Sequence, residues 1–168
     1  EEVEGRVPET EPEVTTEEGR EKEITPEQYV KDLKETKESD PEGYWSVDEV
    51  TLEAAKDGTI VGNKDGSAVV GKDGDIKGLF KKYTSKAKGV ADKLLQMAIE
   101  KGGIKLDNFD NYLSKIYKRN GFRVVARLPF NKEYAPDGWT EAQGRPDVVA
   151  MLYDPNNELD IDEKTFDD

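Results

Sequence analysis

The sequence contains neither cysteine nor histidine. The lack of cysteine excludes disulfide bonds, thiolate catalysis and cysteine metal sites. The lack of histidine removes the commonest general base and the commonest metal ligand. Any catalysis by this chain therefore depends on carboxylates, tyrosine, lysine, backbone amides or water, and we expect no metal cofactor.

Hydrophobic residues are also scarce. They make up 34% of the 168 residues, whereas charged residues make up 38%. Such a composition predicts one domain with part of the chain disordered. No apolar run is long enough to span a bilayer and no signal peptide is visible, so we expect no membrane association and a cytoplasmic location. The first residue is Glu rather than Met, which indicates a processed product or a piece of a larger protein.

The formal net charge of −13 is concentrated at the two ends of the chain. Residues 1–23 carry ten Glu against three basic residues, and residues 154–168 carry seven acids against one lysine, which leaves the central residues without net charge. We interpret residues 1–23 as a disordered acidic arm and 155–168 as an acidic tail. Because an acidic surface repels nucleic acid, we expect no direct nucleic-acid binding. The alternative is that the arms attract a basic partner from a phage or its host.

The first half of the central segment predicts one helix followed by short antiparallel strands. Thr25, Pro26 and Gln28 have the residue types of a capping box with proline at N1, and Asp40-Pro41 ends the helix. Asp-Gly pairs, which are strong turn signals, then recur at 57–58, 65–66 and 73–74. They separate predicted strands at residues 44–55, 59–63, 67–71 and 76–80. Their regular spacing indicates an antiparallel meander.

From Gly89 the hydrophobic period changes from two to about 3.6 residues, which predicts a helix that ends at Gly102-Gly103. The remaining residues predict a strand at 104–106, a helix at 111–119, a strand at 122–128, a long loop to Pro146 and a strand at 148–153. This order predicts a single α+β domain over residues 24–154 in which helices cross part of the sheet.

The stretch before the helix at Gly89 is rich in lysine. Six lysines occur between residues 77 and 93, with Asp92 as the only acid. A helix N-terminus presents unpaired N–H groups and the positive end of the helix dipole, and glycine lets an anion approach the backbone. The stretch is therefore either an anion site or a solvated lysine-rich loop before an ordinary helix.

Residues 86–91, Lys-Ala-Lys-Gly-Val-Ala, resemble the acyl-CoA motif of the GNAT superfamily of N-acetyltransferases, in which [Gln/Arg]-x-x-Gly-x-[Gly/Ala] cradles the pyrophosphate of coenzyme A. Lys86 stands where Gln or Arg is usual. Residues 113–122 resemble the superfamily's aliphatic-Tyr pair followed by a helix end and Gly-Phe. Many members have Asn seven residues before that Tyr, where this chain has Asp110.

The resemblance extends over residues 45–153 and is closest for GNAT-like proteins encoded by bacteriophages. The shared segments are Gly-Asp-Ile at 74–76, Leu-Asp-Asn-Phe-Asp at 106–110, Ala-Pro-Asp-Gly-Trp at 135–139 and Pro-Asp-Val-Val at 146–149. The resemblance implies a GNAT-like fold, with a central mixed, mostly antiparallel sheet flanked by helices. It also implies a location in the cytoplasm of a bacterial host or in a virion.

The resemblance further implies direct transfer of an acetyl group from acetyl-CoA, the cosubstrate, to an amine. Tyr117 would protonate the departing thiolate, although an aromatic on the apolar face of a helix is also a common core residue. The base that deprotonates the amine stays open among Asp75, Glu133, Asp137 and a water chain. The implied cofactor-binding residues are Leu79, Phe80, Lys81, Lys86, Ala87, Lys88, Gly89, Val90, Ala91 and Asp110.

The long loop before the last strand holds the candidate acceptor-binding residues Tyr134, Trp139 and Arg145. Long loops in compact domains are often functional, and the alternative here is a hydrophobic lid. The amine acceptor itself, a protein or a small molecule, does not follow from the sequence. The main competing function is a degenerate GNAT-fold binding or structural module of a phage. A further alternative is an acidic mimic that occupies a nucleic-acid-binding protein.

Overall fold

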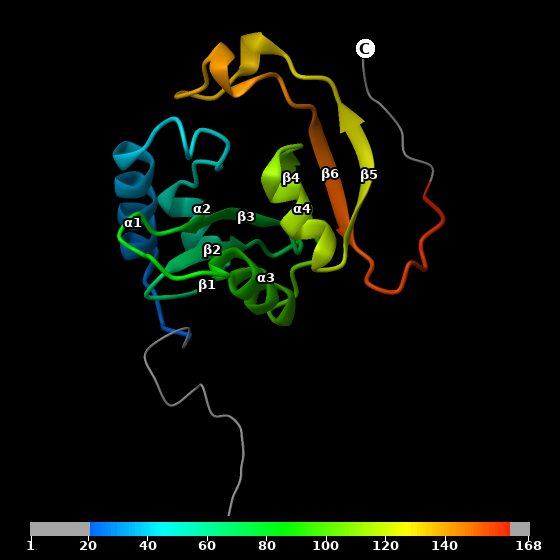
Figure 1. The fold of residues 1–168 in the computed structure, drawn as a ribbon. Coiled ribbons are helices and arrows are strands. Elements are labelled where there is room, and N and C mark those ends of the chain that lie inside the picture. Colours follow the sequence, from blue (N-terminus) through cyan, green and yellow to red (C-terminus); the bar gives the residue numbers. More distant parts are fainter. Residues whose placement is uncertain (1–20, 162–168) are drawn as a thin grey trace, which may run out of the picture.

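The computed structural model of the chain describes residues 21–161. Within them, four helices and six strands form the α+β arrangement that the sequence predicts. The strands make two small antiparallel sheets rather than one continuous sheet. Figure 1 shows α1, α2 and α3 beside the first sheet and α4 beside the second.

The ends of the described segment lie against the domain. The Lys22 backbone N–H donates to the carbonyl of Gly62 at 2.8 Å. After the last strand, the Arg123 guanidinium donates to the Asp154 carboxylate at 2.6 Å and to the carbonyl of Leu159 at 3.1 Å. Most of the predicted acidic arm and half of the predicted tail, at residues 1–20 and 162–168, fall outside the described residues.

Helix α1 spans Pro26–Ser39 and confirms the predicted start and end. The Thr25 side chain accepts from the Gln28 N–H at 3.1 Å. The reciprocal half of the predicted capping box is missing, because the Gln28 amide donates instead to Asp32 at 2.8 Å. Tyr29 and Leu33 are buried on the face of the helix that packs against the first sheet.

The predicted strand at residues 44–55 is wrong. Residues 41–47 form successive turns, and α2 spans Leu52–Asp57. The Thr51 side chain caps this helix by accepting from the Ala54 N–H at 3.1 Å, and the sequence that follows is rich in helix-forming residues. The first Asp-Gly pair is accordingly no hairpin turn, because the Gly58 N–H donates to Ala54 O and ends α2.

The first sheet is the antiparallel meander that the turn spacing predicts. It consists of β1 (Thr59–Asn63), β2 (Gly66–Val70) and β3 (Ile76–Lys81) in that order. The central strand β2 is buried throughout, because each face of the sheet carries its own core. Ala68 and Val70 pack against α3, whereas Val69 packs against α1, as the alternation of side chains along a strand requires.

Strand β3 contains a bulge at Gly78. Ser67 pairs with Phe80 but Val69 pairs with Lys77, so β3 has one extra residue between these two pairs. Gly78 has φ +60°, and its carbonyl accepts from the buried Tyr29 hydroxyl at 2.8 Å. A Cβ at Gly78 would overlap that hydroxyl, which is why this position requires glycine.

The second sheet has the order β4–β6–β5. Its strands are β4 (Lys105–Phe109), β5 (Phe122–Leu128) and β6 (Val148–Tyr153). Helix α3 (Val90–Glu100) joins β3 to β4, and α4 (Tyr112–Arg119) joins β4 to β5. These elements agree with the predicted ones, apart from a β4 that is longer than expected. Among residues 21–161, no helix is both long and apolar enough to cross a membrane.

The two sheets meet at one point and then diverge. The Ile104 N–H donates to Gly74 O at 2.9 Å, and Asp75 and Lys105 form a single parallel bridge. Beyond this bridge, β3 and β4 belong to different sheets and form no ladder with each other. We call the space between the two diverging strands the wedge. Side chains of residues 46–48 and of α4 fill it.

Candidate functional site

The N-terminus of α3 is open to a ligand. Its N-cap, Gly89, has a left-handed backbone with φ +72° and no side chain to cap the helix. A Cβ added at Gly89 would meet no atom within 4 Å. The first N–H groups of a helix have no partner within the helix and carry the positive end of its dipole. The lysine-rich stretch therefore ends in a backbone geometry that suits an anion.

The only acid in this stretch, Asp92, is paired with residues at the end of α4. Asp92 accepts two hydrogen bonds from Arg119, at 2.9 and 2.5 Å, and one from Asn120 at 2.7 Å. The bonds from Arg119 and Asn120 hold the pKa of Asp92 below its usual value. The pairing joins α3 to α4, and residues of both helices line one cavity.

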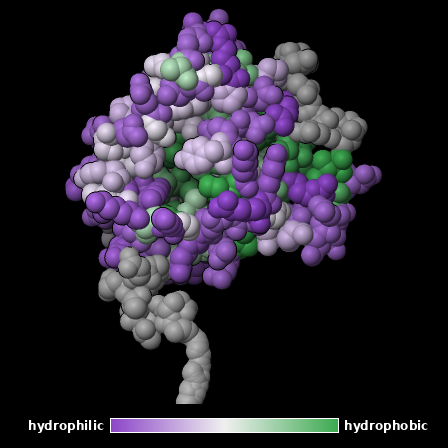
Figure 2. Space-filling view, viewed as in Figure 1, coloured by the Kyte–Doolittle hydropathy of each residue, from purple (hydrophilic) through white to green (hydrophobic). Residues whose placement is uncertain are grey.

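This cavity has a volume of about 350 Å³. We call it the α3 cavity. Its walls come from β3, from the turn and first residues of α3, from α4 and from the segment after α1. In the space-filling view, hydrophobic surface shows among hydrophilic side chains in the middle of this face (Figure 2). The lining residues are Gly43, Tyr44, Ser46, Val47, Leu79, Phe80, Lys81, Ala87, Lys88, Gly89, Val90, Ala91, Asp92, Tyr112, Leu113, Ile116 and Arg119.

Most of the residues that the resemblance assigns to the cofactor come together here. Of the ten, only Lys86 and Asp110 do not line the α3 cavity. Lys86 lines a neighbouring opening beside Ser85. Asp110 lies elsewhere and accepts from Arg127 at 2.8 Å, an interaction that lowers its pKa. Sequence reasoning missed Tyr44, Tyr112 and Arg119, which no part of the acyl-CoA motif indicates.

A second, much smaller cavity of about 30 Å³ lies in the wedge. Ser46, Val47, Leu79 and Leu113 line both cavities, so the small one continues the α3 cavity toward the point where β3 and β4 meet. Tyr117 also lines the small cavity, and its side chain is 6% exposed. The ring packs edge-on against Phe122, with the centroids 6.5 Å apart.

The Tyr117 hydroxyl has no hydrogen-bond partner among residues 21–161. Burial, followed by the charge of Asp48 and then Tyr112, raises the pKa of this phenol above its ordinary value. The group is therefore protonated at neutral pH and faces a cavity in which it can donate a proton. Tyr117 is at the same time part of the hydrophobic core, as the alternative interpretation expected.

Three carboxylates stand around the small cavity. Asp48 and Asp107 line it, and Asp75 lies at the bridge where the sheets meet. The Asp48 side chain is exposed, yet the protein atoms around its carboxylate, and then the charges of Asp107 and Asp75, raise its pKa. Asp75 is one of the predicted base candidates. Asp48 was not predicted as a site residue, because it lies in the segment for which a strand was wrongly predicted.

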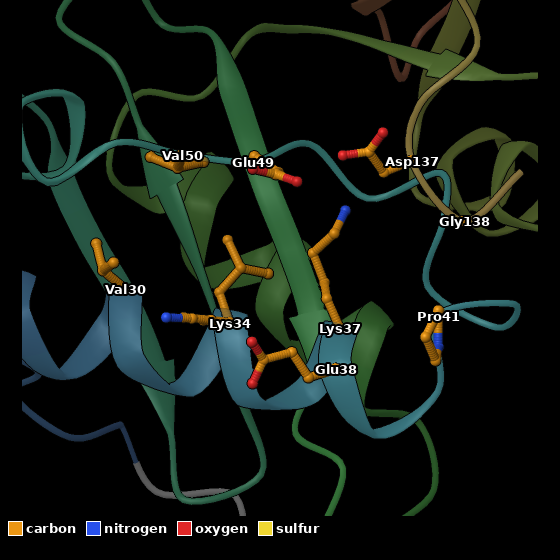
Figure 3. A pocket seen from close by; sticks show the side chains of 10 residues that line it. Val30, Lys34, Lys37, Glu38, Pro41, Glu49, Val50, Asp137 and Gly138 are labelled. Atoms are coloured by element: carbon orange, nitrogen blue, oxygen red, sulfur yellow. The ribbon is translucent and has the colours of Figure 1, made fainter.

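The other two base candidates lie apart from this cavity. Glu133 belongs to a short 3-10 turn, Lys132–Tyr134, on the loop between β5 and β6. Asp137 lines a separate cavity of about 400 Å³ between α1 and that loop, shown in Figure 3. There Lys37 extends from α1 toward Glu49 and Asp137, and its ammonium donates to the Val47 carbonyl. Burial lowers the pKa of Lys37, and the carboxylates Glu49, Asp48 and Asp137 oppose this effect.

The three candidate acceptor-binding residues line neither the α3 cavity nor the small cavity. Tyr134 is 80% exposed, and Arg145 pairs with Glu141 through two hydrogen bonds. Trp139 donates its ring N–H to the carbonyl of Gly144 at 2.7 Å and packs against Phe130 with centroids 5.0 Å apart. Trp139 therefore supports the loop.

Within the described part of the chain, no group of three or more acidic side chains is arranged to hold a metal ion. The sequence matches no protein-family model and no curated protein.

Proposed function

We propose that this chain is a GNAT-type N-acetyltransferase that transfers an acetyl group from acetyl-CoA to an amine. The observation that carries the proposal is the meeting of two features at the wedge. The open N-terminus of α3 lines the α3 cavity, and the Tyr117 hydroxyl, which has no partner among residues 21–161, lies at the small cavity that shares walls with it. The two sheets would then be the two halves of a GNAT-like sheet that separate at the cofactor.

In this proposal the residues of the α3 cavity have distinct roles. The first N–H groups of α3 and the Lys88 ammonium would hold the pyrophosphate of coenzyme A. The edge of β3 at Leu79–Lys81, which pairs with no other strand, would orient the pantetheine arm. Acetyl-CoA supplies the acyl group as a thioester. Gly78 makes a bulge in β3 next to Tyr117, and the backbone there would stabilise negative charge on the reacting carbonyl oxygen.

Two proton movements complete the transfer. The Tyr117 hydroxyl would donate its proton to the departing thiolate sulfur, and a raised phenol pKa keeps that proton in place until the sulfur leaves. The amine would lose its proton to a carboxylate of the wedge, for which Asp48 is the best placed because its charge acts directly on Tyr117. A raised carboxyl pKa makes Asp48 a stronger base than an ordinary aspartate.

A non-catalytic binding or structural module with the same fold is the competing proposal. It is favoured by Asp110, which pairs with Arg127 instead of facing the α3 cavity. Lys86, in place of the usual Gln or Arg, also faces a different opening.

The test is a thiol-release assay with acetyl-CoA and a mixture of primary amines. Because the chain contains no cysteine, every thiol that a disulfide reagent detects comes from coenzyme A. Tyr117→Phe should lower the rate by about 10²- to 10⁴-fold, the usual contribution of a general acid. The same change should leave the melting temperature almost unaltered, because the hydroxyl has no partner to lose among the described residues.

Two outcomes would contradict the enzyme proposal. One is a folded wild-type chain that releases no thiol above the rate without amine. The other is a Tyr117→Phe variant that is as active as wild type, which would leave Tyr117 as a core residue only.

A further inference from the structure

Tyr44 connects the segment between α1 and α2 to strand β3. Its hydroxyl donates to the Lys81 carbonyl at 3.1 Å, and both residues line the α3 cavity. Partial burial, followed by the charges of Tyr112 and Asp40, raises the pKa of the Tyr44 phenol, which is therefore a hydrogen-bond donor at neutral pH. A hydroxyl of the chain thus occupies a backbone acceptor within the proposed cofactor site.

The Lys81 carbonyl lies on the edge of β3 that faces away from β2. Lys82, the residue after β3, donates its N–H to the Asp65 carbonyl in the turn between β1 and β2, at 2.7 Å. Successive residues of an extended chain direct their N–H and C=O groups to opposite edges, so those of Lys81 point the other way. Because β3 is the last strand of the first sheet, no strand pairs with that edge. Tyr44 therefore satisfies a carbonyl that no neighbouring strand reaches.

The proposed pantetheine arm runs along this same edge, at Leu79–Lys81. Pantetheine contains secondary amides, and an amide that lies along a free strand edge donates its N–H to an exposed carbonyl, as an added strand does. In this structure the Tyr44 hydroxyl holds the Lys81 carbonyl, and Tyr44 is part of the cavity wall beside it. The hydroxyl and the arm therefore compete for one acceptor.

The backbone around Tyr44 can stay in place while its side chain moves. Residues 41–47 form turns, and the Tyr44 N–H donates to the Asp40 carbonyl at 3.1 Å. Trp45, the next residue, is 6% exposed and belongs to the core. These contacts hold the segment without the Tyr44 hydroxyl. The Tyr44 ring is partly exposed and can leave Lys81 by rotation about its own side-chain bonds.

We propose that Tyr44 closes the free edge of β3 until the pantetheine arm displaces its hydroxyl from the Lys81 carbonyl. The free energy of the bond between Tyr44 and Lys81 then reduces the affinity for acetyl-CoA. This inference rests on the proposed acetyltransferase function. It adds a control on access to the cosubstrate site, in which a residue that lines the cavity weakens binding instead of strengthening it.

The test is calorimetric titration of acetyl-CoA into the full chain and into Tyr44→Phe. Phenylalanine keeps the ring and removes the hydroxyl, so the arm meets a free carbonyl. Because one net hydrogen bond changes an equilibrium by about fivefold, we expect the Kd for acetyl-CoA to fall by about fivefold in the variant. A tyrosine whose hydroxyl binds the ligand gives the opposite result, since its removal raises the Kd.

A second ligand and a second variant locate the effect. Adenosine 3′,5′-bisphosphate has the nucleotide part of coenzyme A without the pantetheine arm, so Tyr44→Phe should change its Kd by less than about twofold. Tyr83→Phe is the matched control, because Tyr83 lies just after β3, is 46% exposed and lines neither the α3 cavity nor the small cavity. It should leave the Kd of both ligands unchanged.

The outcomes separate this inference from the function beneath it. If the wild-type chain binds acetyl-CoA and Tyr44→Phe binds it equally or more weakly, Tyr44 does not close the edge, and the acetyltransferase proposal is unaffected. An equal gain for adenosine 3′,5′-bisphosphate would also overturn the inference, because that ligand has no arm to compete with Tyr44. If the folded wild type and the folded variant both fail to bind acetyl-CoA, the inference and the proposed function are both wrong.

Discussion

At the scale of single residues, Gly78 and Tyr29 show how the core shapes the site. The Tyr29 hydroxyl donates to the Gly78 carbonyl from the face of the sheet opposite to Tyr117, and this bond holds the bulge in β3. Neither residue lines the α3 cavity. Their contact nevertheless decides how β3 presents its backbone where the two sheets separate.

Gly78→Ala should therefore be strongly destabilising. The left-handed conformation costs a non-glycine residue about 1–2 kcal/mol, and the overlap of the new Cβ with Tyr29 adds about 1–3 kcal/mol. Gly102→Ala is the matched control, because Gly102 also has a positive φ but a Cβ there meets no atom within 4 Å. Urea unfolding of both variants would measure the difference, and equal losses would contradict the proposed contact.

Some of the site residues could be predicted from the sequence and others could not, for physical reasons. Gly89 and Tyr117 carry local signals, a glycine at a helix start and an aromatic beside an Asn-Gly helix end. Asp48, Tyr112 and Asp107 carry none, because their roles depend on which strands and helices face them across the wedge. A carboxylate whose neighbours lie far away in sequence cannot be recognised from its own surroundings in the chain.

At the scale of elements, the same distinction holds. Strands β1 to β3 follow from Asp-Gly turns and α1 from its cap, all of which are local features. The strand predicted at 44–55 is wrong although the aromatic and β-branched residues of this segment are typical of a strand. These residues are Tyr44, Trp45, Val47 and Val50. Trp45 and Val50 are buried in this irregular segment, and their burial outweighs the strand pattern.

The loop between β5 and β6 is attached to the domain by a row of aromatic rings. Trp45 packs on Phe109 at 4.7 Å between centroids, Phe109 on Phe130 at 6.2 Å, and Phe130 on Trp139 at 5.0 Å. The row joins the segment after α1, the end of β4 and two points of this loop. It explains why the Ala-Pro-Asp-Gly-Trp run is ordered although it contains no helix or strand.

Trp139→Ala should release this loop without unfolding the domain. The change removes a ring contact worth about 0.5–1.5 kcal/mol and a hydrogen bond worth about 1 kcal/mol. Trypsin cleavage after Lys132 should accelerate by about tenfold. Tyr134→Ala is the control, since Tyr134 lies on the same loop and is almost fully exposed. Equal cleavage rates in the two variants would show that the aromatic row does not hold the loop.

At the scale of the whole molecule, the separation of the two sheets creates the candidate site. A single parallel bridge joins them, and α3 and α4 then fill one side of the opening while residues 46–48 fill the other. The open N-terminus of α3 lines the α3 cavity, and Tyr117, Asp48 and Asp107 line the small cavity beside it. The order of these groups along the wedge is what makes an acyl transfer from coenzyme A to an amine the best-supported function.

The most direct test of this account is calorimetric titration of acetyl-CoA into the wild-type chain, Gly89→Asn and Gly89→Asp. Asn and Asp have nearly the same shape and both tolerate the left-handed backbone of Gly89, so the two variants differ mainly in charge. We predict saturable micromolar binding by wild type, a similar affinity for Gly89→Asn, and at least about a tenfold loss for Gly89→Asp. No binding by the folded wild-type chain at millimolar acetyl-CoA, or equal affinities for the two variants, would contradict the assignment of the α3 N-terminus as the coenzyme A site.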